Sequence, residues 1–172
     1  MSVHPIVRYG QPVLEQKAAT IVEFDTPELH QLVEDMFESM YAARGVGLAA
    51  PQIGISKRVA VIDVSSGEDP EKKLVLVNPE IIHKEGSQTG EEGCLSLPTF
   101  REPVKRAQKV TVRARDAKGK EFEMTGEDLL ARAFLHETDH LNGTLYIGHI
   151  SALKRDLIRR KIRKLQKANE WG

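Results

Sequence analysis

Two histidines four residues apart, His136 and His140, enclose a glutamate in the pattern His-Glu-x-x-His. On an α-helix, residues at this spacing lie about 40° apart around the axis and about 6 Å apart along it, so both imidazoles can reach one cation. Glu137 is turned away by about 100°, which lets it contact water at that cation without being a ligand. A divalent metal lowers the pKa of water that it binds, and a neighbouring carboxylate can move the proton to a leaving amine. The pattern therefore predicts metal-dependent hydrolysis, against the alternative of two solvated histidines with an incidental glutamate.

A catalytic site of this kind needs a third protein ligand and one open position for water. In one large class of zinc proteases, a glycine and then a third histidine follow the motif. Gly143 is in place, but Tyr146 stands where that histidine would be. The remaining candidates are His149, Glu170 and Cys94, which is the one cysteine of the chain. A lone cysteine is otherwise read as a small buried apolar residue.

Three segments resemble the signature motifs of the peptide deformylase family and follow the family's order. They are Gly45-Val46-Gly47-Leu48-Ala49-Ala50-Pro51-Gln52, Glu92-Gly93-Cys94-Leu95-Ser96 and His136-Glu137-Thr138-Asp139-His140. The similarity spans nearly the whole chain. It implies removal of the N-formyl group from the N-terminal formylmethionine of newly synthesised proteins, giving formate and a free amino terminus. The alternative is a metallopeptidase of the His-Glu-x-x-His type that cleaves peptide bonds.

The resemblance also implies a metal centre. Its ligands would be Cys94, His136 and His140. One thiolate and two imidazoles suit iron, zinc, cobalt or nickel. The family implies Fe(2+) as the physiological ion, with Zn(2+), Ni(2+) or Co(2+) possible in a preparation. Because iron beside an accessible thiolate is prone to oxidation, we expect activity to decay in air.

Other roles follow from the same resemblance. Glu137 is the implied general base and acid, while Gln52 and the backbone N–H of Leu95 are implied donors to the developing oxyanion. Preorganised donors of this kind are typically worth about 3 to 4 kcal/mol each. A loop amide that caps a turn is the alternative reading of Gln52.

The substrate would lie along a glycine-containing strip. Gly45, Val46 and Gly47 are the implied contacts, because glycine permits close backbone approach and an extended peptide can add as a strand. Arg101 corresponds to a family arginine near the substrate path. An apolar pocket for the methionine side chain is expected from Val46, Leu95 and the start of the metal-binding helix. Two departures bear on this pocket: Leu135 replaces a frequent glutamine, and Arg132 occupies a position expected to be apolar.

The elements that position these residues predict an α+β fold, with antiparallel β-sheets packed around a central metal-binding helix and a C-terminal helix. We expect one catalytic domain over residues 1–172. A helix is predicted from Pro27, capped by Thr26, and the metal helix over 127–141, capped by Thr125. The predicted strands are 59–64, 74–77, a separate one from Ile81, and the hairpin strands at 109–115 and about 122–124.

Charge and hydropathy give further expectations. Lys+Arg and Asp+Glu both number 25, so the formal net charge is zero. Nothing approaches the roughly 18 to 20 apolar residues of a membrane span, and residues 1–10 do not resemble a signal or transit peptide. We therefore expect a cytoplasmic protein without membrane contact.

A last helix is predicted over 152–168, dense in lysine and arginine with Asp156 as the only acid between 154 and 167. Its apolar stripe is expected to contain Leu153, Leu157, Ile158, Ile162 and Leu165. Such a helix can be an ordinary amphipathic helix with a solvated basic face. The resemblance favours contact with the ribosome through attraction to ribosomal RNA.

Overall fold

The computed structural model describes residues 2–171. Within that range the helices are α1 (Pro27–Ala42), α2 (Asp128–Leu141) and α3 (Ala152–Lys167). The strands are β1 (Gly47–Ala49), β2 (Val59–Ile62), β3 (Leu74–Glu85), β4 (Gln88–Cys94), β5 (Leu97–Arg106), β6 (Lys109–Arg115) and β7 (Glu121–Glu127). Short 3-10 helices span Pro12–Glu15, Ala50–Ile53, Pro70–Lys72 and Tyr146–His149. The predicted α+β class is confirmed.

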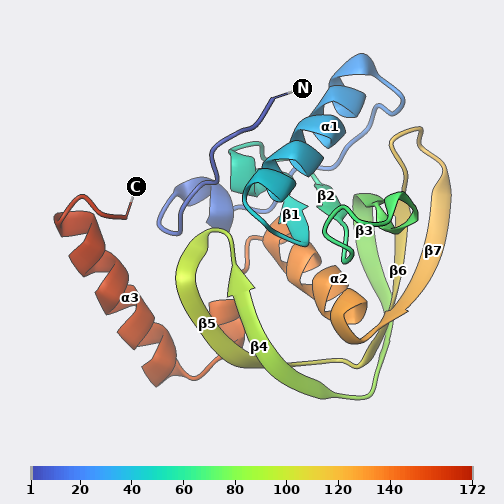
Figure 1. Ribbon diagram of the computed structural model, residues 1–172. Coiled ribbons are helices and arrows are strands. Elements are labelled where there is room, and N and C mark those ends of the chain that lie inside the picture. The colour runs from blue at the N-terminus through green and yellow to red at the C-terminus, as the bar shows by residue number, and fades with distance from the viewer. Residues whose placement is uncertain (1, 172) are drawn as a thin grey trace.

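Two antiparallel sheets surround the helix that carries the histidines. The larger sheet has the strand order β1-β2-β3-β6-β7, and β4 pairs with β5 in the smaller one. Helix α2 packs against β1, β2, β3, β6 and β7. Figure 1 shows α2 in the middle of the molecule, with the long bent β4–β5 hairpin on one side and the larger sheet on the other. The predicted central helix between antiparallel sheets is therefore present.

Apolar faces fix this arrangement. Helix α1 begins as predicted, with the Thr26 side chain accepting a hydrogen bond from Leu29 N, and it buries an apolar face that includes Met36 and Met40. Helix α2 buries Phe134 and Leu141 against a cluster that includes Val110 and Val112 of β6. Burial of a large apolar side chain contributes about 1.5 to 3 kcal/mol. Packing on the sheet thus sets which face of α2 is left for chemistry.

Strand β3 is longer than predicted. Residues 74–77 and the stretch from Ile81 belong to one strand, Leu74–Glu85, with a register shift against β6 between Val77 and Glu80. The prediction of a separate strand was wrong because Pro79, which lacks an N–H, lies within this irregularity and does not end the strand.

The start of α2 also corrects a prediction. Thr125 is not its cap: it lies in β7, where its Oγ1 is 2.7 Å from Thr111 Oγ1. The helix begins at Asp128 after Glu127, which makes no capping hydrogen bond through its side chain. The local pattern assigns the Thr125 hydroxyl to capping, but this hydroxyl contacts the neighbouring strand instead. The helix end is as predicted, with Asn142 at the C-cap.

Helix α3 keeps only part of its predicted stripe. Ile158 and Ile162 are buried, whereas Leu153 and Leu157 are 71% and 49% exposed. Leu165 is partly buried and packs with Ile158 and Ile162 against the rest of the chain. In Figure 1 this helix lies at the side of the molecule, away from the larger sheet. None of the helices within residues 2–171 is long and apolar enough to cross a membrane.

Candidate metal centre and active site

Three side chains from two distant segments meet at the centre of the molecule. Cys94 ends β4, while His136 and His140 are one turn apart on α2. Their ligand atoms all lie within 4.8 Å of one another, and Cys94 Sγ is 3.3 Å from His140 Nε2. A thiolate and two imidazoles converging in this way fit one divalent transition-metal ion with an open position. This is the metal site that the sequence predicts.

The other two candidate ligands lie elsewhere. His149 Nε2 is 2.9 Å from Asp139 Oδ2, so this imidazole is engaged outside the ligand group. Glu170 is exposed beyond the end of α3 and is not part of the group. Within the described chain, the structure thus brings together only the cysteine with the two helix histidines.

Gln52 lies directly beside the cysteine and is buried. Its Oε1 accepts a hydrogen bond from Ala49 N at 3.0 Å, which turns its Nε2 toward Cys94 Sγ at 3.5 Å and Ser96 Oγ at 3.2 Å. The side chain is therefore held from both ends. This geometry keeps an N–H donor next to the ligand group, as a donor to a developing oxyanion requires.

His136 is held by a buried carboxylate. Its Nδ1 is 2.7 Å from Glu92 Oε1, so the proton belongs on Nδ1 and Nε2 is left free to bind a metal. Burial raises the pKa of Glu92, but hydrogen bonds from His136 and Arg106 and the charge of Arg106 outweigh it and hold that pKa well below its usual range. Glu92 therefore remains an ionised acceptor.

Two arginines complete the surroundings of this carboxylate. Arg106 donates from Nε to Oε2 at 3.0 Å and from Nη2 to Oε1 at 2.7 Å, while Arg132 Nη1 donates to Oε2 at 2.6 Å. Together with His136, these donors occupy both oxygens of Glu92 twice. At the position that was expected to be apolar, the buried guanidinium of Arg132 is directed at Glu92 and Val104 O.

His140 has different surroundings. The side chain is fully buried, and its Nδ1 has no hydrogen-bond partner among the described residues. Burial lowers its pKa well below the ordinary value. The imidazole is therefore neutral, as a metal ligand must be.

Glu137 is the remaining acid of the motif. It is 3% exposed, and its Oε1 has no partner within the described chain. Burial is the largest cause that raises its pKa, to about 7. A carboxyl group poised near neutrality, beside the ligand group, suits proton transfer in both directions.

Glycines bring the backbone close to this acid. A Cβ added at Gly47 would lie 2.5 Å from Glu137 Oε2, and one added at Gly45 would lie 2.7 Å from Leu95 Cδ1. Larger residues at either position would displace these side chains. Strand β1, which begins at Gly47, forms the edge of the larger sheet.

Arg101 is exposed and pairs with Glu91 at 3.5 Å.

Sequence reasoning missed the residues that hold His136. Glu92 was recognised as part of a motif but given no role, and Arg106 was not singled out. The position of Glu92 in the sequence indicates such a role, because it lies two residues before the ligand Cys94. A glutamate that is buried there must pair with another side chain. The partners, however, come from β5 and α2 and are not adjacent in sequence.

A Cys-His-His group with buried histidines and a partly exposed cysteine, next to a carboxyl with a pKa near 7, is typical of a metal-dependent hydrolase. The model of the polypeptide deformylase family matches residues 3–156. A peptide deformylase of Acidobacterium capsulatum is 64% identical over 171 residues, covering 99% of this chain and 100% of the relative. The chain belongs to the polypeptide deformylase family.

Solved structures agree with this assignment. A peptide deformylase from Legionella pneumophila superposes with a TM-score of 0.90 at 46% identity, with 98% of each chain covered. That from Thermus thermophilus gives a TM-score of 0.85 at 40% identity, with 94% of each chain covered. The likeness therefore extends over nearly the whole length of each chain.

Proposed function

We propose that the protein hydrolyses the N-formyl group of formylmethionine at the amino terminus of newly synthesised proteins, releasing formate and a free amine. The observation that carries this is the convergence of Cys94, His136 and His140 beside Glu137. Residues 1–172 act in this proposal as a single catalytic domain.

The chain's own groups account for the proton movements and for charge stabilisation. When bound, a divalent ion at the three ligands supplies Lewis acidity that polarises the formyl group and acidifies water. Glu137 takes a proton from the attacking water and returns it to the nitrogen of the leaving amine. Gln52 Nε2 and the Leu95 N–H donate to the formyl oxygen as its negative charge develops.

The substrate peptide lies in this proposal along Gly45, Val46 and Gly47, adding to the edge of the larger sheet. Val46, Leu95 and the start of α2 form part of an apolar pocket for the methionine side chain. We propose that Arg101, which is exposed on β5, lies near the outgoing peptide. Its ion pair with Glu91 can be exchanged for a contact with the substrate at little cost, because exposed ion pairs contribute only about 0 to 1 kcal/mol.

The proposed physiological metal is Fe(2+), with Zn(2+), Ni(2+) or Co(2+) able to occupy the same ligands. Cys94 is partly exposed, which leaves its sulfur open to oxidation. An iron-loaded sample should therefore lose activity in air, and a nickel-loaded sample should lose it more slowly. Full activity of the iron form after long aeration would contradict this proposal.

The decisive experiment measures formate released from a formyl-Met peptide, with metal content determined on the same sample. We expect one formate and one free amino terminus per peptide. Cys94→Ala should lose both metal and activity. Cleavage at internal peptide bonds, with metal retained in Cys94→Ala, would instead support the alternative metallopeptidase of the His-Glu-x-x-His type.

We further propose that the protein works in the cytoplasm and contacts the ribosome through the basic face of α3. Arg160, Lys161 and Lys164 are exposed there, where they can contact phosphates without disturbing the buried Ile158 and Ile162. Replacing the three by glutamate should reduce co-sedimentation with ribosomes and its salt dependence. Unchanged co-sedimentation would remove this proposal while leaving the enzymatic one intact.

A further inference from the structure

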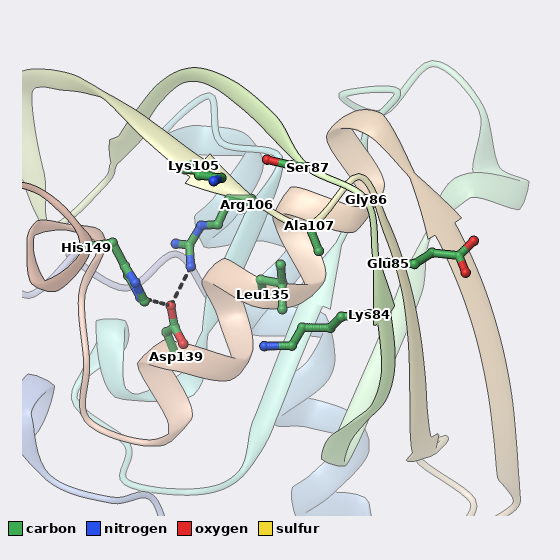
Figure 2. Close-up of a pocket in the computed structure, with 10 residues that line it drawn as sticks. All are labelled: Lys84, Glu85, Gly86, Ser87, Lys105, Arg106, Ala107, Leu135, Asp139 and His149. Carbon is green, nitrogen blue, oxygen red and sulfur yellow. Dashed lines mark hydrogen bonds and ion pairs between the residues drawn. The ribbon is translucent and has the colours of Figure 1, made fainter.

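Asp139 lies at a variable position of the histidine motif but makes contacts away from the ligand group. Its Oδ2 is 2.8 Å from Arg106 Nη1 and 2.9 Å from His149 Nε2. Figure 2 shows both side chains directed at this carboxylate, beside an open groove of about 550 Å³ that Leu135 also lines. Asp139 therefore joins a surface imidazole to a buried guanidinium.

Arg106 continues the connection inward. Its Nη1 binds Asp139, while its Nε and Nη2 bind the two oxygens of Glu92. The Arg106 side chain is 4% exposed and that of Glu92 is 5% exposed. Because the guanidinium is planar, fixing its outer nitrogen also fixes the angle at which the other two meet Glu92.

Glu92 transfers this orientation to a metal ligand. The same Oε1 that accepts from Arg106 Nη2 also lies 2.7 Å from His136 Nδ1. A rotation of Arg106 would thus shift the acceptor that sets the tautomer and ring angle of His136. The charges of the group also balance, since two carboxylates, Glu92 and Asp139, face the two guanidinium groups of Arg106 and Arg132.

We propose that Asp139 is a positioning residue of the metal centre, acting on His136 through Arg106 and Glu92. The inference rests on the metal site of the proposed function. Arg132 holds Glu92 independently, with Val104 O and Gln88 Oε1 as its own anchors at 3.1 Å and 3.4 Å. Loss of Asp139 should therefore loosen the ligand His136 without abolishing metal binding.

The test compares Asp139→Ala with Asp35→Ala in the full chain. Asp35 is a matched control because it also pairs with a half-exposed histidine, His4 at 3.2 Å, but on α1 and away from the metal ligands. We expect Asp139→Ala to release Zn(2+) to a chelator about 10-fold faster than wild type. Its Co(2+) form should show a shifted visible absorption spectrum and a lower kcat with little change in KM. Asp35→Ala should match wild type in all of these.

Milder variants separate positioning from general loss of stability. Asp139→Asn keeps the shape and should give a smaller acceleration in the same direction, and His149→Ala a smaller one still. If Asp139→Ala fails to fold, these two variants carry the test. Wild-type Zn(2+) release and Co(2+) spectra in every soluble Asp139 and His149 variant would overturn the inference, even if thermal stability falls.

The readouts also distinguish this inference from the proposed function. Metal release and the Co(2+) spectrum are measured without substrate, so they report on His136 whatever reaction the protein catalyses. Absence of formate release by wild type would refute the deformylase proposal alone. Formate release by wild type with unchanged metal release in the variants would refute the role of Asp139 alone.

Discussion

Two glutamates at the metal centre are almost equally buried, but their pKa values are shifted in opposite directions. Glu92 is 5% exposed and Glu137 is 3% exposed. The pKa of Glu92 is held well below its usual range, whereas that of Glu137 is raised to about 7. Burial alone raises the pKa of both carboxyl groups, so their different partners must decide the outcome.

The partners separate a structural carboxylate from a reactive one. Both oxygens of Glu92 are occupied by donors from Arg106, Arg132 and His136. Glu137 has an oxygen with no partner among the described residues. When the environments of two neighbouring carboxyl groups drive their pKa values apart, the group with the lowered pKa acts as a fixed charge and the group with the raised pKa can carry a proton. Here that division coincides with the proposed roles.

The sharpest test of this contrast is Glu137→Ala. Removing the proton carrier should lower kcat by about 10²- to 10⁴-fold. Metal content should stay at the wild-type level because the three ligands are untouched. The free energy of unfolding should change much less than kcat, because the substitution also removes a buried carboxyl group that lacks a full set of hydrogen-bond partners. Formate release, metal analysis and thermal unfolding on one preparation would check all three outcomes.

Retention of wild-type turnover in Glu137→Ala would contradict the proposed role of Glu137 as the proton carrier, and with it the proposed difference from Glu92. Glu137→Gln is a useful control for shape, because the amide fills the same space but cannot accept and return a proton. Both variants are expected to be similarly inactive.

Glu92→Gln should show the opposite balance of effects. An amide offers one acceptor oxygen in place of two; it leaves the buried Arg132 without a counter-charge and Arg106 with that of Asp139 alone. Breaking such a buried ion pair typically costs about 3 to 5 kcal/mol of stability. Weakened orientation of His136 should lower metal affinity by about 10- to 100-fold. Denaturant unfolding and metal titration measure the two losses.

Saturating metal should restore much of the turnover of Glu92→Gln but none of that of Glu137→Ala. This rescue distinguishes a carboxylate that holds a ligand from one that moves a proton. If excess metal restores neither variant, Glu92 must contribute to the reaction itself and the proposed division is wrong.

The sequence predicts the ligands but not what orients them, and the reason is physical. His136 and His140 are related by helix geometry, which is local and can be read from spacing. Glu92 meets Arg106 across the β4–β5 hairpin and Arg132 from α2, 14 and 40 residues away. Such contacts depend on tertiary packing, which no local pattern encodes.

The same limit explains which elements were predicted. The β6–β7 hairpin alternates apolar and polar residues and was predicted. Strand β4, Gln88–Cys94, contains two glycines and two glutamates and carries no strand pattern of its own. It is formed by pairing with β5 and by the ion pairs of Glu92. Conversely, Thr125 satisfies a local capping pattern that the sheet overrides.

A third buried carboxylate, Asp63, extends the comparison to a position outside the metal centre. It accepts hydrogen bonds from Tyr41, Ser65 and Gly67 N. Burial raises its pKa, but the hydrogen bonds from Ser65 and Tyr41 outweigh it and lower that pKa below the ordinary value of 3.8. Asp63 thus resembles Glu92 in its partners, although no arginine is among them.

Asp63→Asn should therefore give the smallest effect, a stability loss of about 1 to 3 kcal/mol at neutral pH, with kcat close to wild type. Because the folded pKa is depressed, the charge of Asp63 stabilises the protein above its unfolded pKa, and this contribution is lost as the pH falls through the folded pKa. The difference between wild type and Asp63→Asn should consequently narrow below about pH 4. Urea unfolding from pH 7 to pH 3 measures it. A difference independent of pH would mean that shape, and not the ionised state of a fully partnered carboxylate, provides the stabilisation.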